Sequence, residues 1–129
     1  MLTGLNILLI DDEFDFVDTT CKRLTRRGFS ARIALTCAEG LTIIESGWPN
    51  VVVLDVMLPD RNGMDLLQEI KARWPALPVI LLTGHASMQA GLRGLDYGAS
   101  DYCLKPIEME VLVEKIALAH RESTQQAGG

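Results

Sequence analysis

The stretch VVVLDVMLPD, residues 51–60, carries an unbroken run of apolar residues straight into an acid, Asp55. A short apolar run without alternation is typical of a strand that is buried on both faces of a parallel sheet. An unpaired carboxylate at the end of such a strand would be strongly unfavourable. We therefore expect Asp55 to have a charged partner, a bound ion or a chemical role.

Strand-like and helix-like segments alternate on both sides of this stretch. We predict strands at 5–10, 30–35, 51–55, 78–83 and 101–104, and helices at 14–27, 37–46, 63–73, 86–97 and 107–121. Such alternation implies right-handed crossovers and a doubly wound α/β fold with helices on both faces of a parallel sheet. We expect one domain over 1–121 and a flexible polar tail over 122–129.

The composition of the 129 residues excludes several classes of protein. The net charge is -5 and no run of Lys and Arg occurs, which argues against direct nucleic-acid binding. Charges interrupt every apolar run, and the N-terminus lacks the pattern of a secretion signal, so we expect no membrane association. The three widely spaced cysteines are typical of reduced thiols in a cytoplasmic protein.

Polar residues follow four of the five predicted strands. Asp11 and Asp12 follow the first strand, Asp55 ends the third, Thr83 ends the fourth and Lys105 follows the fifth. Because the carboxyl ends of parallel strands share one edge of the sheet, these five side chains should converge there.

The predicted cluster holds more negative than positive charge. Two carboxylates about 4 Å apart repel by about 4 kcal/mol at an effective dielectric near 20, and Lys105 offsets only one charge. A divalent cation such as Mg²⁺ would balance the rest and leave room for a phosphoryl group. Lys105 and Thr83 would then contact phosphoryl oxygens, and Asp55 is the natural nucleophile.

Four motifs carry a resemblance to a known family: LLIDDE, VVVLDVMLPDRNGMDLL, VILLTGHA and GASDYCLKP. Together they resemble the receiver domain of response regulators in two-component signalling, the CheY-like superfamily, from about residue 5 to residue 121. The resemblance implies a flavodoxin-like (βα)5 fold with strand order 2-1-3-4-5. It also implies a phosphorylation-activated switch, whose Asp55 takes a phosphoryl group from a sensor histidine kinase or phosphotransfer protein.

The resemblance further implies a metal site for Mg²⁺ or Mn²⁺. Asp12 and Asp55 would bind the ion directly, the backbone carbonyl of Met57 would be a third ligand, and Asp11 would hold a metal-bound water.

Three more residues take roles from the resemblance. Lys105, expected before a cis proline, would pair with Asp55 and then with the phosphate. Thr83 would hydrogen-bond the phosphate and Tyr102 would rotate inward behind it, which makes this pair the expected switch.

The resemblance implies that the fourth helix, fifth strand and fifth helix form the face that controls an output protein or domain. It leaves open a dimer that depends on phosphorylation. The chain would catalyse only its own phosphorylation and dephosphorylation, so it is not expected to be an enzyme in the usual sense.

Other interpretations of the same residues exist. Asp11 and Asp12 could simply cap the first helix, and Tyr102 could be an ordinary edge aromatic. A degenerate receiver would act as an unphosphorylated scaffold. A haloacid-dehalogenase-type hydrolase would need Asp where Met57 stands, and a flavin carrier would need a Ser/Thr/Gly-rich loop in place of DDEFD.

The first predicted helix places Phe14, Val17, Cys21 and Leu24 on one buried stripe, with Phe16 outside it. Phe16 is therefore either an exposed docking contact for the kinase or a side chain folded over its own surface.

Glycines and a methionine distinguish this chain. Gly91 and Gly94 either weaken the fourth helix or permit close packing. The resemblance implies that Met57 and His85 border the water that attacks the phosphoryl group. Because Met57 cannot hydrogen-bond that water well, we expect a phosphoryl lifetime of minutes or longer.

Overall fold

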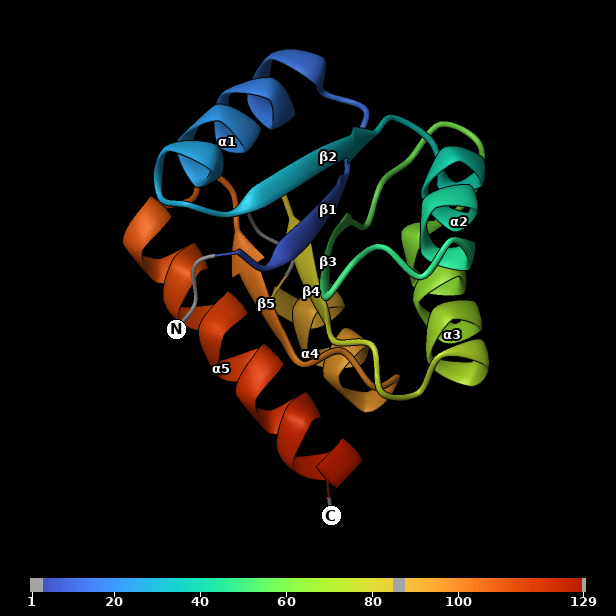
Figure 1. The fold of residues 1–129 in the computed structure, drawn as a ribbon. Coiled ribbons are helices and arrows are strands. Elements are labelled where there is room, and N and C mark those ends of the chain that lie inside the picture. Colours follow the sequence, from blue (N-terminus) through green and yellow to red (C-terminus); the bar gives the residue numbers. More distant parts are fainter. Residues whose placement is uncertain (1–3, 85–87, 129) are drawn as a thin grey trace.

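The structure is a computed structural model that describes residues 4–84 and 88–128. Strands and helices alternate along the chain in the order β1 (Asn6–Ile10), α1 (Phe14–Arg26), β2 (Ser30–Ala34), α2 (Cys37–Glu45), β3 (Val51–Asp55), α3 (Gly63–Arg73), β4 (Val79–Thr83), α4 (Met88–Asp96), β5 (Asp101–Leu104) and α5 (Met109–Gly128). The strands form one parallel sheet with the order β2-β1-β3-β4-β5, which confirms the predicted doubly wound fold (Figure 1).

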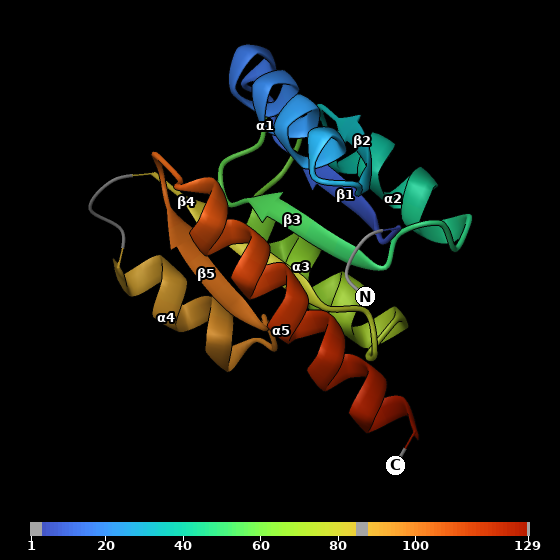
Figure 2. The same cartoon turned by 60° about the vertical axis from the view of Figure 1, so that its left-hand side comes forward.

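Helices cover both faces of this sheet, as the two ribbon views show (Figures 1 and 2). Alternate residues of β3 point into two separate cores. Val51 and Val53 pack with residues of α1 and α5, whereas Val52 and Leu54 pack with residues of α2 and α3. Each such burial contributes about 1.5–3 kcal/mol before the opposing chain entropy is counted. The apolar run at 51–54 has no alternating polar residues because β3 has a hydrophobic core on each of its faces.

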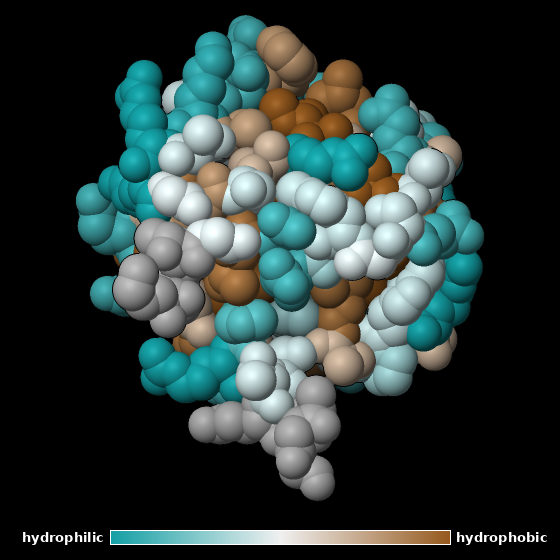
Figure 3. Space-filling model, viewed as in Figure 1, coloured by the Kyte–Doolittle hydropathy of each residue, from teal (hydrophilic) through white to brown (hydrophobic). Residues whose placement is uncertain are grey.

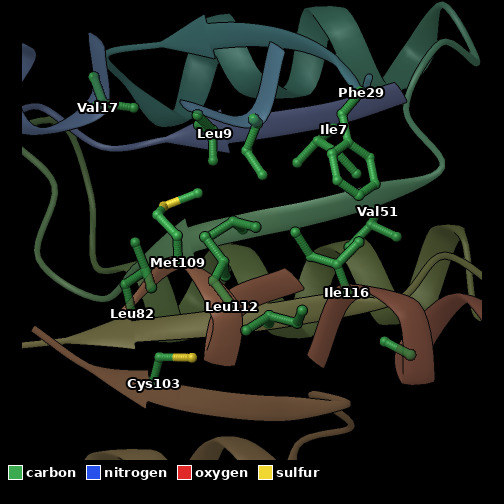
Figure 4. Packing of buried hydrophobic residues seen from close by; sticks show 14 residues of the cluster. Ile7, Leu9, Val17, Phe29, Val51, Leu82, Cys103, Met109, Leu112 and Ile116 are labelled. Atoms are coloured by element: carbon green, nitrogen blue, oxygen red, sulfur yellow. The ribbon is translucent and has the colours of Figure 1, made fainter. Parts of the chain in front are cut away.

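The core under α1 and α5 is drawn in Figure 4. Leu112 and Ile116 of α5 lie there beside β3 and β4, and Val17 of α1 belongs to the same core. The three cysteines are unpaired, as predicted. Burial raises the pKa of the Cys37 thiol to about 12, so that side chain behaves as a small apolar residue.

The buried stripe predicted for α1 is wrong at its first position. Val17 and Leu24 are buried, but Phe14 is 54% exposed. Phe16 is half-buried instead and packs against the core under α1 and α5. The helix therefore turns a different side to the sheet in its first turn than the spacing of apolar residues indicates.

The last helix also differs from its prediction. α5 runs to Gly128 and does not stop at residue 121. Its final turns consist largely of good helix formers such as Glu122, and the Ser123 hydroxyl donates a hydrogen bond to the carbonyl of Ala76. The polarity of this segment indicated a tail, but polar residues also suit a solvated helix. Its flexibility stays a prediction.

Among the described residues, no helix is both long and apolar enough to cross a membrane. In the space-filling view, hydrophilic residues lie mainly around the edge of the visible face, and hydrophobic ones show at its top and toward its middle (Figure 3).

Gly94 lies where α4 crosses β4. A Cβ atom at this position would lie only 2.0 Å from Cδ1 of the buried Leu81. For Gly94 this contact supports the close-packing interpretation, while the mobility of α4 stays a prediction. For Gly91, in the same helix, the choice between a weakened helix and close packing stays a prediction.

We expect Gly94→Ala to lower the free energy of unfolding by about 1–3 kcal/mol, because overpacking outweighs the gain in helix propensity. Urea denaturation measures this change. Gly84→Ala is the control, because an added Cβ there would meet no described atom within 4 Å apart from its neighbours in the chain. Equal midpoints for the two variants would contradict the packing role of Gly94.

Candidate functional site

The carboxyl ends of the strands bring the predicted polar residues to one edge of the sheet. Asp11 and Asp12 follow β1, Asp55 ends β3, Thr83 ends β4 and Lys105 follows β5. The backbone N–H of Lys105 donates to the carbonyl of Thr83 at 2.8 Å, which continues the pairing of β4 with β5 into the site. The predicted convergence is therefore confirmed.

Three carboxylates form the negative part of the site. One oxygen from each of Asp11, Asp12 and Asp55 lies within 4.8 Å of the others. Asp11 and Asp55 are buried, while Asp12 is exposed. Burial, and next the charge of Asp11, raise the pKa of Asp55 to about 6, although Lys105 opposes the shift. The cluster thus has the surplus of negative charge that the sequence indicates.

This oxygen-rich cluster fits a hard divalent cation. Mg²⁺ and Mn²⁺ prefer carboxylate, carbonyl and water ligands, and Mg²⁺ commonly uses one or two carboxylates. Within the described residues, the pocket at the site has a volume of about 290 Å³ and is lined by Asp12, Glu13, Asp55, Met57, Gly84 and Lys105. Protein carboxylates and open space for water are therefore both present.

The loop between β3 and α3 fixes the surroundings of Asp55. Gly63 donates its backbone N–H to the carbonyl of Val56 at 2.8 Å. A Cβ on Gly63 would lie 2.4 Å from the carbonyl oxygen of Asp55, so only glycine fits here. In the same loop, the Asp60 carboxylate accepts hydrogen bonds from the backbone N–H groups of Cys37 and Ala38 and so helps to cap the start of α2.

Lys105 supplies the positive charge of the site. Its Nζ lies 2.8 Å from Oδ2 of Asp11, 2.7 Å from Oε1 of Glu13 and 3.6 Å from Oδ2 of Asp55. Burial by itself would lower the pKa of Lys105, but the bonds to Asp11 and Glu13 outweigh burial and raise it. The peptide bond from Lys105 to Pro106 is cis, as expected.

The partnership of Glu13 with Lys105 was missed by sequence reasoning. The only signal was the third acid in the run DDE, and a third acid there is equally typical of a helix start.

Thr83 and Tyr102, the predicted switch residues, lie in different surroundings. The Thr83 hydroxyl is buried at the end of β4 and has no hydrogen-bond partner among the described residues. Tyr102 is half-buried on β5, beside the core of α2 and α3, and is outside the charged cluster. His85, which sequence analysis also placed near the site, lies outside the described residues.

The raised pKa of Asp55 predicts that its ionised carboxylate destabilises the folded state of the metal-free protein. The folded-state pKa of about 6 exceeds the ordinary value of 3.8, so the stability of the folded state falls as the pH rises through about 6. We expect Asp55→Asn to raise the free energy of unfolding at pH 8 by about 1 to 2 kcal/mol, allowing for solvent screening.

Urea denaturation in a chelator, at pH 8 and at pH 4, measures this effect, and the gain should shrink at the lower pH. Asp15→Asn is the control, since Asp15 is exposed in the same region. If Asp55→Asn is no more stable than wild type at pH 8, the ionised Asp55 carboxylate does not destabilise the folded state.

Comparison with known proteins gives consistent similarities. The family model described as the response regulator receiver domain matches residues 7–117. The transcriptional regulatory protein DltR of Streptococcus agalactiae is 32% identical over 120 residues, which is 93% of this chain and 54% of that protein. Response regulator MprA of Mycolicibacterium vanbaalenii is 32% identical over 124 residues, covering 96% of this chain and 54% of MprA. The chain thus spans about half the length of these curated relatives.

Solved structures show the same similarity in three dimensions. A CheY-like receiver domain protein from Methanospirillum hungatei superposes with a TM-score of 0.88 at 33% identity, covering 96% of this chain and 99% of that one. The receiver domain of NtrX from Brucella abortus has a TM-score of 0.85 at 32% identity, covering 89% of this chain and 98% of that one. Residues 7–117, which the family model matches, include every site residue described above.

Proposed function

The chain belongs to the response regulator receiver domain family, and we propose that it is a phosphorylation-activated switch whose phosphoryl acceptor is Asp55. The observation that supports this most directly is the environment of Asp55. Its carboxylate is buried and lines a small pocket, beside two other acids and 3.6 Å from the Lys105 ammonium. A nucleophile, counter-charges and space for an incoming group are therefore together.

We assign Asp12 and Asp55, with the backbone carbonyl of Met57, as direct ligands of Mg²⁺ or Mn²⁺, and Asp11 as the partner of a metal-bound water. The close carboxylate oxygens of the three acids support this assignment. The bound ion would supply positive charge to phosphoryl oxygens during transfer.

In the proposed reaction, a carboxylate oxygen of Asp55 attacks the phosphorus of a phosphohistidine on a sensor kinase or phosphotransfer protein. The new O–P bond forms as the N–P bond breaks, and the donor imidazole leaves. Lys105 balances charge on the transferred group, and the Thr83 hydroxyl donates a hydrogen bond to one of its oxygens. The unpartnered hydroxyl of Thr83 has its donor free for this purpose among the described residues.

The proposed output passes through Thr83 and Tyr102 to the face made by α4, β5 and α5. Large apolar side chains are exposed there, including Leu92, Leu95, Leu104 and Val111. Such exposure suits a face that binds an output protein or domain, or a second copy after phosphorylation. One relative, DltR, is a transcriptional regulatory protein by name, but the net charge of -5 argues against direct nucleic-acid binding by this chain. We propose that the switch acts in the cytoplasm. It would catalyse only its own phosphorylation and dephosphorylation.

Phosphoryl uptake is the central test. We expect the wild-type protein with Mg²⁺ and acetyl phosphate to gain the mass of one phosphate, and Asp55→Asn to gain none, because the nucleophile is lost. Intact-protein mass spectrometry measures both, and Asp15→Asn controls for the loss of one acidic charge nearby. Absence of uptake by wild type would instead favour the alternative of an unphosphorylated scaffold.

The lifetime of the phosphorylated form is a separate prediction. Met57 is 79% exposed at the rim of the pocket, where its thioether cannot orient an attacking water well. We expect a half-life of minutes or longer in Mg²⁺, shortened several-fold by Met57→Asn. Loss of phosphate from the isolated protein measures this half-life, and a value of seconds for wild type would refute the prediction.

A further inference from the structure

Lys105 is held by the start of α1 as much as by the carboxylates of the sheet edge. Its Nζ lies 2.7 Å from Oε1 of Glu13 and 4.7 Å from the centre of the Phe16 ring. The distance to Asp55 is 3.6 Å, the longest of its three carboxylate contacts. In this arrangement the side chain is only 13% exposed, so its direction is set by these neighbours.

We propose that Glu13 and Phe16 are positioning residues for phosphoryl transfer. The face of Phe16 keeps the ammonium of Lys105 at the site throughout. Glu13 holds the same ammonium only at rest and is replaced by an oxygen of the incoming phosphoryl group. The inference rests on the proposed function of Asp55 and adds a role for residues that family resemblance did not assign.

The burial of Phe16 supports its role as a fixed platform. Its ring packs against the core under α1 and α5, so it cannot easily turn away from Lys105. A cation over an aromatic face is attracted by the ring quadrupole, more strongly when water is partly excluded. A docking role would make Phe16 matter only with a protein donor, whereas contact with Lys105 makes it matter with any donor.

The exposure of Glu13 supports its role as a replaceable partner. Its side chain is 63% exposed, so its ion pair with Lys105 is screened by water and is cheap to break. Glu13 is the N-cap of α1, but its side chain makes no capping hydrogen bond. An ammonium has three N–H donors, and Asp11 and Glu13 lie within hydrogen-bond distance of it, whereas Asp55 at 3.6 Å does not. For the Lys105 ammonium to move toward a phosphoryl group on Asp55, one of the two short contacts must lengthen, and Glu13 is the more exposed partner.

The kinetic test uses the full chain, Mg²⁺ and acetyl phosphate. We expect Phe16→Leu, which keeps apolar volume without a ring, to lower the phosphorylation rate at saturating donor by about threefold to tenfold. Phe16→Tyr keeps the ring and should stay within about twofold of wild type. Equal rates for the Leu and Tyr variants would overturn the role of Phe16.

Glu13→Gln tests the second half of the proposal. We expect it to raise the rate by about twofold to fivefold, because the ammonium is released from a screened ion pair. Asp15→Asn removes the same charge from the same turn and controls for long-range repulsion of the anionic donor. If Glu13→Gln is no faster than Asp15→Asn, Glu13 does not compete for Lys105. This exposed variant decides the role of Glu13 even if Phe16→Leu fails to fold.

Nuclear magnetic resonance of Lys105 gives a readout without donor or metal. The ring current of Phe16 should shift the Cε protons of Lys105 upfield in wild type and in Phe16→Tyr, and the shift should vanish in Phe16→Leu. An unchanged shift in Phe16→Leu would overturn the contact. If wild type takes up no phosphate, the proposed function fails, and this measurement still decides whether Phe16 holds Lys105.

Discussion

Repulsion among Asp11, Asp12 and Asp55 is the constraint on which the site depends. Two of these carboxylates are buried, and the pKa of Asp55 is raised to about 6 because burial and Asp11 both disfavour its charge. Lys105 balances part of this charge and lies close to both buried acids. A sheet edge with this imbalance is poised to bind positive charge, and a divalent cation would reduce the repulsion among the ionised acids.

The packing of the strands allows the fold to tolerate this excess of negative charge. The apolar strands β1, β3 and β4 are packed on both faces, so their ends have little freedom to separate the charges. Gly63 closes the loop after Asp55 where no other residue fits, and Asp60 ties that loop to the start of α2. Stability contributed by the cores therefore offsets the electrostatic cost at one edge, as is common at functional sites.

Much of the site was predictable because it depends on strand ends. The residues that end the strands can be read from local hydrophobic patterns, and parallel strands bring their carboxyl ends together. The side of α1 that faces the sheet was not predictable in the same way. Phe14 and Phe16 are two apolar residues in one turn, and spacing by itself favoured the wrong one. The end of α5 was missed because polarity does not distinguish a solvated helix from a tail.

The sequence by itself determined the doubly wound fold and the membership of the charged cluster, since both follow from local pattern and from the geometry shared by all parallel sheets. The strand order came from family resemblance, because loop composition does not specify which strands are neighbours. Only the tertiary structure decided the partners of Lys105. Glu13 lies 92 positions from it along the chain, and no local pattern reports how α1 packs beside the loop that carries the lysine.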